Sequence, residues 1–181
     1  MSGGAPGYTI RAATPADSAV IAAHRVAMFR DMGRLAGGGA EAADALAGAV
    51  IGYLAEALAS GEYAGWLALD TAGQVVAGLG VQLRPVVPSP GPGGRVLTAP
   101  QAYLLNVYTA PAWRRRGVAE ALVRRALAWA EARGCSSVAL HASDAGRTLY
   151  ERLGFRPTNE MRFHGAPEAI ARCPVPPRPN P

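Results

Sequence analysis

The sequence predicts one α/β domain, a sandwich of helices around a mixed β-sheet. The length of 181 residues suits a single domain and is enough to bury a core without disulfides or metals. Half of the residues are hydrophobic and 17% are charged, a composition typical of globular rather than disordered proteins. The expected order is strand, two helices, three strands, helix, strand, helix and one or two closing strands. This order indicates layers of helices packed on a β-sheet.

The N-terminal half is expected to hold one strand, two helices and a hairpin. Thr14 is a good N-cap residue and Pro15 suits a first helical turn, so a helix should begin there. Asp17 favours the positive end of that helix. Alternating apolar residues on both sides of residues 71–74 predict the hairpin. The expected bounds are a strand over 8–11, helices over 14–32 and 41–59, and strands over 62–70 and 75–83.

The C-terminal half is expected to alternate strands and helices. Residues 85–100 are dense in proline and glycine, which predicts a loop, and its length suggests a functional role. After Arg116 apolar positions recur every three or four residues, as on the buried face of a helix, and Gly134 and Gly154 suit helix ends. The expected bounds are strands over 101–109 and 137–142, helices over 116–133 and 144–153, closing strands over 155–158 and 160–164, and a disordered proline-rich tail over 166–181.

The positive charge of the chain comes from arginine alone. The net charge is +5 and there is no lysine, a usage that, with abundant Ala, Gly and Pro, is typical of a GC-rich genome. The total charge therefore says little about partners. The clustering of arginines at 114–116 and 124–125 says more, because a local basic patch suits a phosphate-bearing ligand or nucleic acid.

The sequence indicates a cytoplasmic protein with no membrane partner and no metal. The N-terminus lacks the basic segment and apolar run of a signal peptide. The longest apolar stretch, 46–58, is interrupted by Gly52 and Glu56 and is too short to span a bilayer. Cys135 and Cys173 follow no metal-ligand spacing and cannot form a disulfide framework, which favours a reducing compartment.

The most informative segment is 107–119, where a strand leads through a basic turn into a helix. The first turn of a helix has backbone N–H groups without partners and a partial positive charge. Gly117 lets the backbone approach a ligand closely, small Ala119 leaves the turn uncrowded, and the arginines add forked donors. These features predict an anion site for a diphosphate. The alternative is an ordinary surface helix, although three arginines there would oppose the helix dipole.

Two motifs resemble the GNAT acetyltransferase superfamily. Residues 114–119, Arg-x-x-Gly-x-Ala, are similar to its Q/R-x-x-G-x-G/A motif, and residues 150–155, Tyr-x-x-x-Gly-Phe, are typical of its penultimate helix and last strands. The two signals stand in the family's order, separated by one helix and one strand. The resemblance implies a central mixed, mostly antiparallel twisted sheet with helices on both faces, in a single acetyltransferase domain over 1–165.

The resemblance implies an N-acyltransferase that moves an acetyl or other short acyl group from acyl-CoA to a primary amine by direct attack. The diphosphate of acetyl-CoA would lie on the N–H groups of 116–119, and the pantetheine arm along 107–109. The N–H of Val107 would polarise the thioester carbonyl, and Tyr150 would protonate the leaving thiolate as general acid. The implied cofactor contacts are Val107, Tyr108, Thr109, Arg114, Arg115, Arg116, Gly117, Val118, Ala119 and Ser143.

The acceptor side is less well marked. Phe29 and Asp31 on the first helix and Asn106 on the central strand are the candidate contacts for a small-molecule or peptide amine. Each also has an ordinary structural interpretation: Phe29 as a core residue at helical spacing, Asp31 as a solvated carboxylate. Tyr150, likewise, could simply pack its ring at the rim.

Departures from the family pattern leave other functions open. Ser143 stands where many members carry asparagine, and the strand 101–110 holds no carboxylate for a general base, so a water relay, His141 or Asp144 remain candidates. An acyl-CoA-binding sensor or pseudoenzyme without turnover is therefore the alternative. A nucleic-acid-binding domain ranks last because no helix-turn-helix, zinc or RNP-type motif accompanies the arginines. A homodimer would be common for this family.

Overall fold

The computed structural model describes residues 7–35 and 37–161. The chain forms two compact units, residues 1–147 and 148–181. The first unit holds the whole sheet and the helices that cover it. The predicted disordered tail over 166–181 lies outside the described residues.

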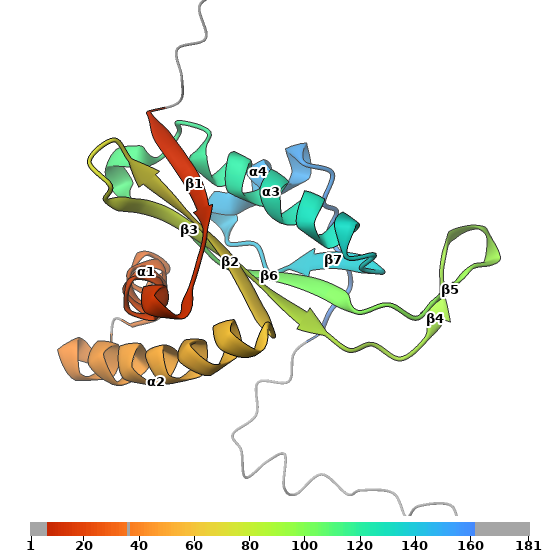
Figure 1. The fold of residues 1–181 in the computed structure, drawn as a ribbon, viewed down its shortest axis with the longest axis horizontal. Coiled ribbons are helices and arrows are strands. Elements are labelled where there is room, and N and C mark those ends of the chain that lie inside the picture. Colours follow the sequence, from red (N-terminus) through yellow and green to blue (C-terminus); the bar gives the residue numbers. More distant parts are fainter. Residues whose placement is uncertain (1–6, 36, 162–181) are drawn as a thin grey trace, which may run out of the picture. The chain divides into compact units, whose positions relative to one another are not determined.

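A five-stranded sheet forms the centre of the first unit (Figure 1). Its strand order is β1-β2-β3-β6-β7; every neighbouring pair is antiparallel except β6 and β7, which run parallel. The predicted mixed, mostly antiparallel sheet is therefore confirmed. The strands are β1 (Tyr8–Ala12), β2 (Tyr63–Asp70), β3 (Val75–Arg84), β6 (Gln101–Thr109) and β7 (Ser137–Leu140).

Helices cover both faces of this sheet. In Figure 1, α1 and α2 lie on one side of the strands and α3 on the other. The helices are α1 (Ser18–Asp31), α2 (Gly39–Ser60), α3 (Val118–Ala132) and α4 (Asp144–Arg152), with 3₁₀ turns η1 (Pro15–Asp17) and η3 (Pro111–Trp113). These bounds agree with the predicted helices to within a few residues, the usual uncertainty of helix ends.

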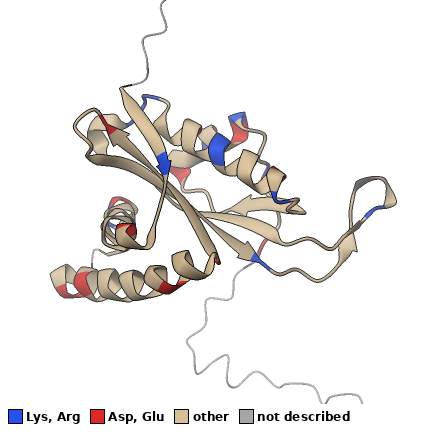
Figure 2. Ribbon diagram, in the orientation of Figure 1, with Lys and Arg blue, Asp and Glu red and all other residues tan. Residues whose placement is uncertain are grey.

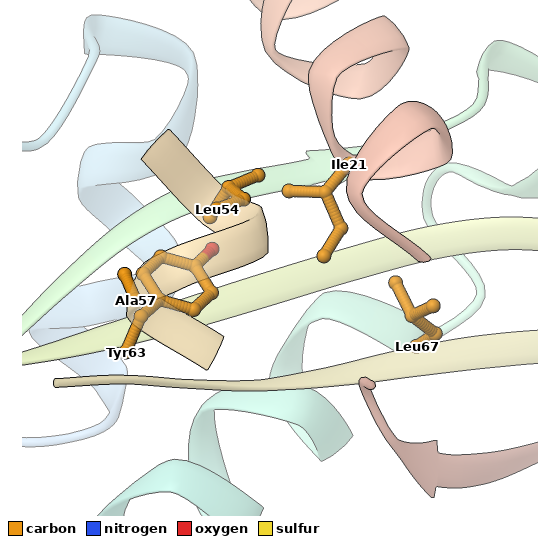
Figure 3. Close-up of a cluster of buried hydrophobic side chains, with 5 residues drawn as sticks. All are labelled: Ile21, Leu54, Ala57, Tyr63 and Leu67. Carbon is orange, nitrogen blue, oxygen red and sulfur yellow. The ribbon is translucent and has the colours of Figure 1, made fainter. Parts of the chain in front are cut away.

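One face of β2 packs against the helix layer formed by α1 and α2. Tyr63 and Leu67, four residues apart, point to the same face and pack with Ile21, Leu54 and Ala57 of α1 and α2 (Figure 3). All five are at most 5% exposed, so each contributes most of its hydrophobic transfer free energy.

The opposite face of β2 packs on α3. Trp66 meets Trp129 edge to face, with ring centroids 5.8 Å apart. The repeating apolar positions on α3 are buried as predicted: Val118, Leu122, Val123, Ala126 and Ala130.

Two local predictions were wrong. The segment 85–100 is not only loop: β4 (Ser89–Pro90) and β5 (Val96–Leu97) pair as a short antiparallel hairpin around η2 (Pro92–Gly94). Strands of two residues are too short to show the alternation of apolar and polar residues by which a strand is predicted, and the many prolines and glycines of this segment favour a loop instead. The predicted strand over 155–158 is absent, and residues 160–161 are irregular; the rest of the strand over 160–164 lies outside the described residues.

Helix α2 is longer than the apolar stretch 46–58 suggested. It has 22 residues, and by length and composition it could cross a membrane, with mean hydropathy 1.4. Leu54 and Ala57 are nevertheless part of the core against α1 and β2. The interior of a soluble domain passes the same test, so this helix does not indicate a span by itself.

Candidate active site

A bulge interrupts the central strand β6. The register with β3 runs from Leu105 opposite Gly80 to Tyr108 opposite Gly78, so two residues of β6 lie opposite Leu79 alone. Those two residues are Asn106 and Val107, and Asn106 has φ 54°, in the left-handed region that asparagine tolerates best after glycine. A bulge leaves ladder groups unpaired and redirects side chains. Val107, predicted to polarise a carbonyl, therefore stands where β6 departs from its ladder.

The strands β6 and β7 part just before this bulge. Their parallel pairing runs from Gln101 opposite Ser137 to Leu104 opposite Leu140, where β7 ends. The last five residues of β6 thus continue without β7 beside them. Val107, Tyr108 and Thr109, which the resemblance would place along the pantetheine arm, lie in this stretch.

The turn before α3 has the geometry of an anion site. Gly117 is the N-cap with φ 77°, and Arg115 two residues earlier also has positive φ, 63°. The first helical hydrogen bond runs from the N–H of Ala121 to the Gly117 carbonyl at 3.0 Å. The N–H groups of the preceding helical residues, Val118 and Ala119 among them, therefore have no partner within the helix. A Cβ placed on Gly117 would meet no atom within 4 Å. The helix start therefore has donors without intrahelical partners and room beside Gly117, as the predicted diphosphate site requires.

The three arginines of this turn are not equivalent. The Arg114 side chain donates from Nε to the carbonyl of Thr109 at 3.0 Å and pairs with Asp31 at the end of α1. Arg116 lies over the Trp113 ring at 5.0 Å. Among the described residues Arg115 and Arg116 form no ion pair, whereas the charge of Arg114 already has a partner. Asp31, predicted as an acceptor contact, is this partner.

Asn106 is the centre of a buried polar group. It is 7% exposed; its amide donates to the Tyr63 hydroxyl at 3.1 Å, and its carbonyl accepts from the Arg25 guanidinium. Burial raises the pKa of Tyr63 to about 12, so this hydroxyl remains protonated. The predicted acceptor residue Phe29 lies beside the group, with the Arg25 guanidinium 4.8 Å from its ring centroid.

His24 is a functional candidate that the sequence did not single out. Its ring lies 4.9 Å from that of Tyr108, and its Nδ1 is buried without a hydrogen-bond partner in the described structure. A cavity of about 10 Å³ beside His24, Gly78 and Asn106 has room for one water. Burial lowers the pKa of His24 from 6.5, so the ring is neutral at pH 7 and can accept a proton. Only the packing of α1 on β6 brings His24 to the bulge.

The two other base candidates occupy different surroundings. The His141 ring contacts Tyr103, and its Nδ1 bonds to that hydroxyl. Asp144 is the exposed first residue of α4. Ser143 precedes it, and its carbonyl accepts from the N–H groups of Gly146 and Arg147, both at 3.0 Å. Ser143 therefore helps to begin α4.

Tyr150 lies on the last turns of α4. It is 8% exposed, and its ring meets Phe155 edge to face at 5.8 Å. Burial raises the pKa of Tyr150 to about 12. The hydroxyl therefore holds its proton throughout the neutral range, as a general acid must.

A model of the acetyltransferase (GNAT) family matches residues 27–155. The chain belongs to the acetyltransferase (GNAT) family. A solved GCN5-related N-acetyltransferase from Ralstonia eutropha JMP134 agrees: it is 34% identical, with TM-score 0.73, over 87% of this chain and 97% of that one. The resemblance of residues 114–119 and 150–155 to GNAT motifs is thus confirmed, as is the fold class.

Other GNAT relatives are more distant or match less of the chain. One is an aminoglycoside N(6')-acetyltransferase type 1 from Acinetobacter genomosp. 13, which is 36% identical over 69 aligned residues. The alignment covers 36% of this chain and 47% of that protein. The chain spans about half the length of the curated relatives it matches. A predicted acetyltransferase from Clostridium acetobutylicum, solved with acetyl-CoA, is 23% identical with TM-score 0.72, over 87% of this chain and 96% of that one. That likeness bears on the fold alone.

Proposed function

We propose that this protein is an N-acyltransferase that moves an acetyl or other short acyl group from acyl-CoA to a primary amine. The observation that carries the proposal is the turn before α3, where Gly117, with positive φ and room beside it, opens a helix whose first N–H groups have no intrahelical partner. Membership of the acetyltransferase (GNAT) family supports it.

The chain offers a place for each part of acyl-CoA. The N–H groups of 116–119 would hold the diphosphate at the positive end of α3, with Arg115 and Arg116 adding charge. Residues 107–109 of β6, beyond the end of β7, would bind the pantetheine arm along their backbone. The thioester supplies an acyl group already activated for attack by an amine.

The mechanism assigns one task to each of three residues. The N–H of Val107, at the bulge, donates to the thioester carbonyl and stabilises charge that develops on its oxygen. Tyr150, with its raised pKa, gives its proton to the leaving thiolate. His24 accepts the proton of the attacking amine through a water in the adjacent cavity. The amine attacks directly, so no acyl group is carried on the protein.

The acceptor is proposed to be a small-molecule amine. The aminoglycoside N-acetyltransferases among the relatives act on such amines, and their match supports a small acceptor over a peptide. Phe29 and Asn106 remain proposed acceptor contacts, whereas the Asp31 carboxylate is engaged by Arg114. A cytoplasmic location, expected from the sequence, and a homodimer, common in the family, remain predictions. Sedimentation of the purified protein would measure the oligomer.

Calorimetric titration of acetyl-CoA into the purified protein, with a thermal-shift control, tests this function. Micromolar binding, about −8 kcal/mol, is expected and should raise the melting temperature when ligand is in excess. Binding without amine-dependent thiol release would instead favour the sensor or pseudoenzyme. Absence of binding for acetyl-CoA and for longer acyl-CoAs would refute the proposal.

A further inference from the structure

Arg25 is a half-buried cation without a counter-ion among the described residues. Its guanidinium donates to the Asn106 carbonyl and lies over the Phe29 ring, yet it forms no ion pair with any carboxylate of the described residues. Burial lowers the pKa of Arg25, which means that its surroundings disfavour the charged form. A guanidinium has five N–H donors, and an anion bound to those left over would relieve the cost of its desolvation.

A second guanidinium shares the same ring. Arg34, just beyond α1, lies 5.0 Å from the Phe29 ring centroid, against 4.8 Å for Arg25. The charge of Arg34 also lowers the pKa of Arg25, so the two cations repel each other. Tyrosines 53 and 63 are the other ionisable groups that influence Arg25, and neither is an anion at neutral pH. Two like charges close to one ring favour the binding of an oxyanion, because an anion between them would offset their repulsion.

This pair lies beside the position proposed for acyl transfer. Arg25 bonds to Asn106, and Asn106 is the bulge residue next to Val107. Asp31, the acidic residue of α1 nearest its end, already pairs with Arg114. Figure 2 shows other acidic residues along α2, but none of them contributes to the electrostatic surroundings of Arg25. The region next to the bulge is therefore positive.

We propose that the acceptor is a small primary amine that also carries an oxyanion, a carboxylate or a phosphate, bound by Arg25 and Arg34. This rests on the proposed acyl transfer and names its substrate class. The amine would stand near Val107 while its anionic group lies at the two guanidiniums. A polycationic acceptor such as an aminoglycoside would meet like charges there and would be disfavoured.

Matched acceptor pairs test the proposal. Gamma-aminobutyrate against its carboxamide, and 2-aminoethyl phosphate against ethanolamine, differ mainly in the anionic group; kanamycin is the polycation. Thiol release from acetyl-CoA gives kcat/KM for each acceptor. Comparing each acceptor in wild type and in the Arg25→Gln variant cancels its intrinsic reactivity.

The expected result is a loss confined to anionic acceptors. Arg25→Gln should lower kcat/KM for the preferred anionic amine about 10- to 100-fold, mainly through KM, and leave its neutral partner unchanged. Arg25→Lys should restore part of the loss, since the charge returns without the fork. Arg30→Gln removes an exposed arginine from the same helix and should change neither. Equal losses for both members of a pair, or kanamycin as the best acceptor in wild type, would overturn the proposal.

A binding measurement keeps the result independent of turnover. With CoA saturating, inorganic phosphate should raise the melting temperature of wild type and of Arg30→Gln above that in chloride of equal ionic strength, but not that of Arg25→Gln. No rise in wild type, or the same rise in Arg25→Gln, would overturn the anion site. If acetyl-CoA fails to bind, the proposed function falls, and the phosphate comparison still decides on Arg25.

Discussion

Replacing Gly117 separates the strain of the α3 turn from its ability to hold a diphosphate. Gly117 has φ 77°, so any other L-residue costs about 1–2 kcal/mol in the free energy of unfolding. A side chain at this position meets no atom within 4 Å and points into open space, so the fold should survive. In Gly117→Glu the added carboxylate would occupy the place of the diphosphate.

The expected loss of affinity follows from the donors that the carboxylate blocks. Losing two charge-assisted hydrogen bonds, at about 1.5–3 kcal/mol each, weakens acetyl-CoA about 10²- to 10⁴-fold. Gly117→Ala should show the strain with a smaller loss of affinity.

Gly134 supplies the matched control for this experiment. It ends the same helix, has φ 66°, and also faces open space. It lies roughly 25 Å from Gly117, since the two glycines flank a 15-residue helix with a rise of about 1.5 Å per residue. Gly134→Glu should therefore destabilise the protein at least as much and leave the Kd unchanged. Calorimetry gives the Kd, and urea unfolding gives the stability. Unchanged affinity in Gly117→Glu, or equal weakening in Gly134→Glu, would refute the diphosphate assignment.

Three other variants test separate parts of the account. Tyr150→Phe should lower kcat about 10²- to 10⁴-fold with unchanged Kd for acetyl-CoA, because it removes the general acid; unaltered kcat would exclude Tyr150 from the mechanism. Because burial lowers the pKa of His24 in the folded protein, His24 should contribute to the free energy of unfolding above pH 6.5, and this contribution should be lost as the pH falls through the folded pKa. His24→Gln should flatten the pH dependence of the free energy of unfolding in this range and should also slow turnover. Asp17 accepts from Arg11 at 2.7 and 2.8 Å and from the N–H of Thr14 at 2.8 Å, which hold its pKa well below 3.8. Asp17→Asn should cost about 2 kcal/mol at pH 7, a value moderated by the exposure of Arg11, and should remove the stability that wild type loses as the pH falls below 3.8.

The elements that carry a period were predictable from the sequence. Apolar residues at helical spacing located α3, and alternation on both sides of a turn located β2 and β3. Gly117 and the arginines before it were enough to predict an anion turn, because the donors of a helix start are local. The short strands β4 and β5 contain too few residues to show any pattern.

The acceptor side was harder to predict because it depends on contacts across the fold. Arg25 and Asn106 are 81 positions apart, and nothing local to either residue indicates their hydrogen bond. His24 lies in an alanine-rich helix, and only the packing of α1 on β6 brings it to Tyr108. The sequence suggested Asp31 as an acceptor contact, and it gave no sign that the Asp31 carboxylate pairs with Arg114, 83 positions away. Contacts between residues so far apart in the sequence depend on how the whole core packs, which no local pattern shows.

The most direct test of the central claim follows acetyl groups and thiols together. The protein, acetyl-CoA and a panel of primary amines are mixed, and free thiol and acetylated amine are measured over time by a thiol reagent and mass spectrometry. The account predicts one thiol for each acetylated amine, dependence on both substrates, and no acetyl group on the intact protein. Thiol release without amine, or an acetylated protein formed and consumed during turnover, would contradict direct transfer to an amine.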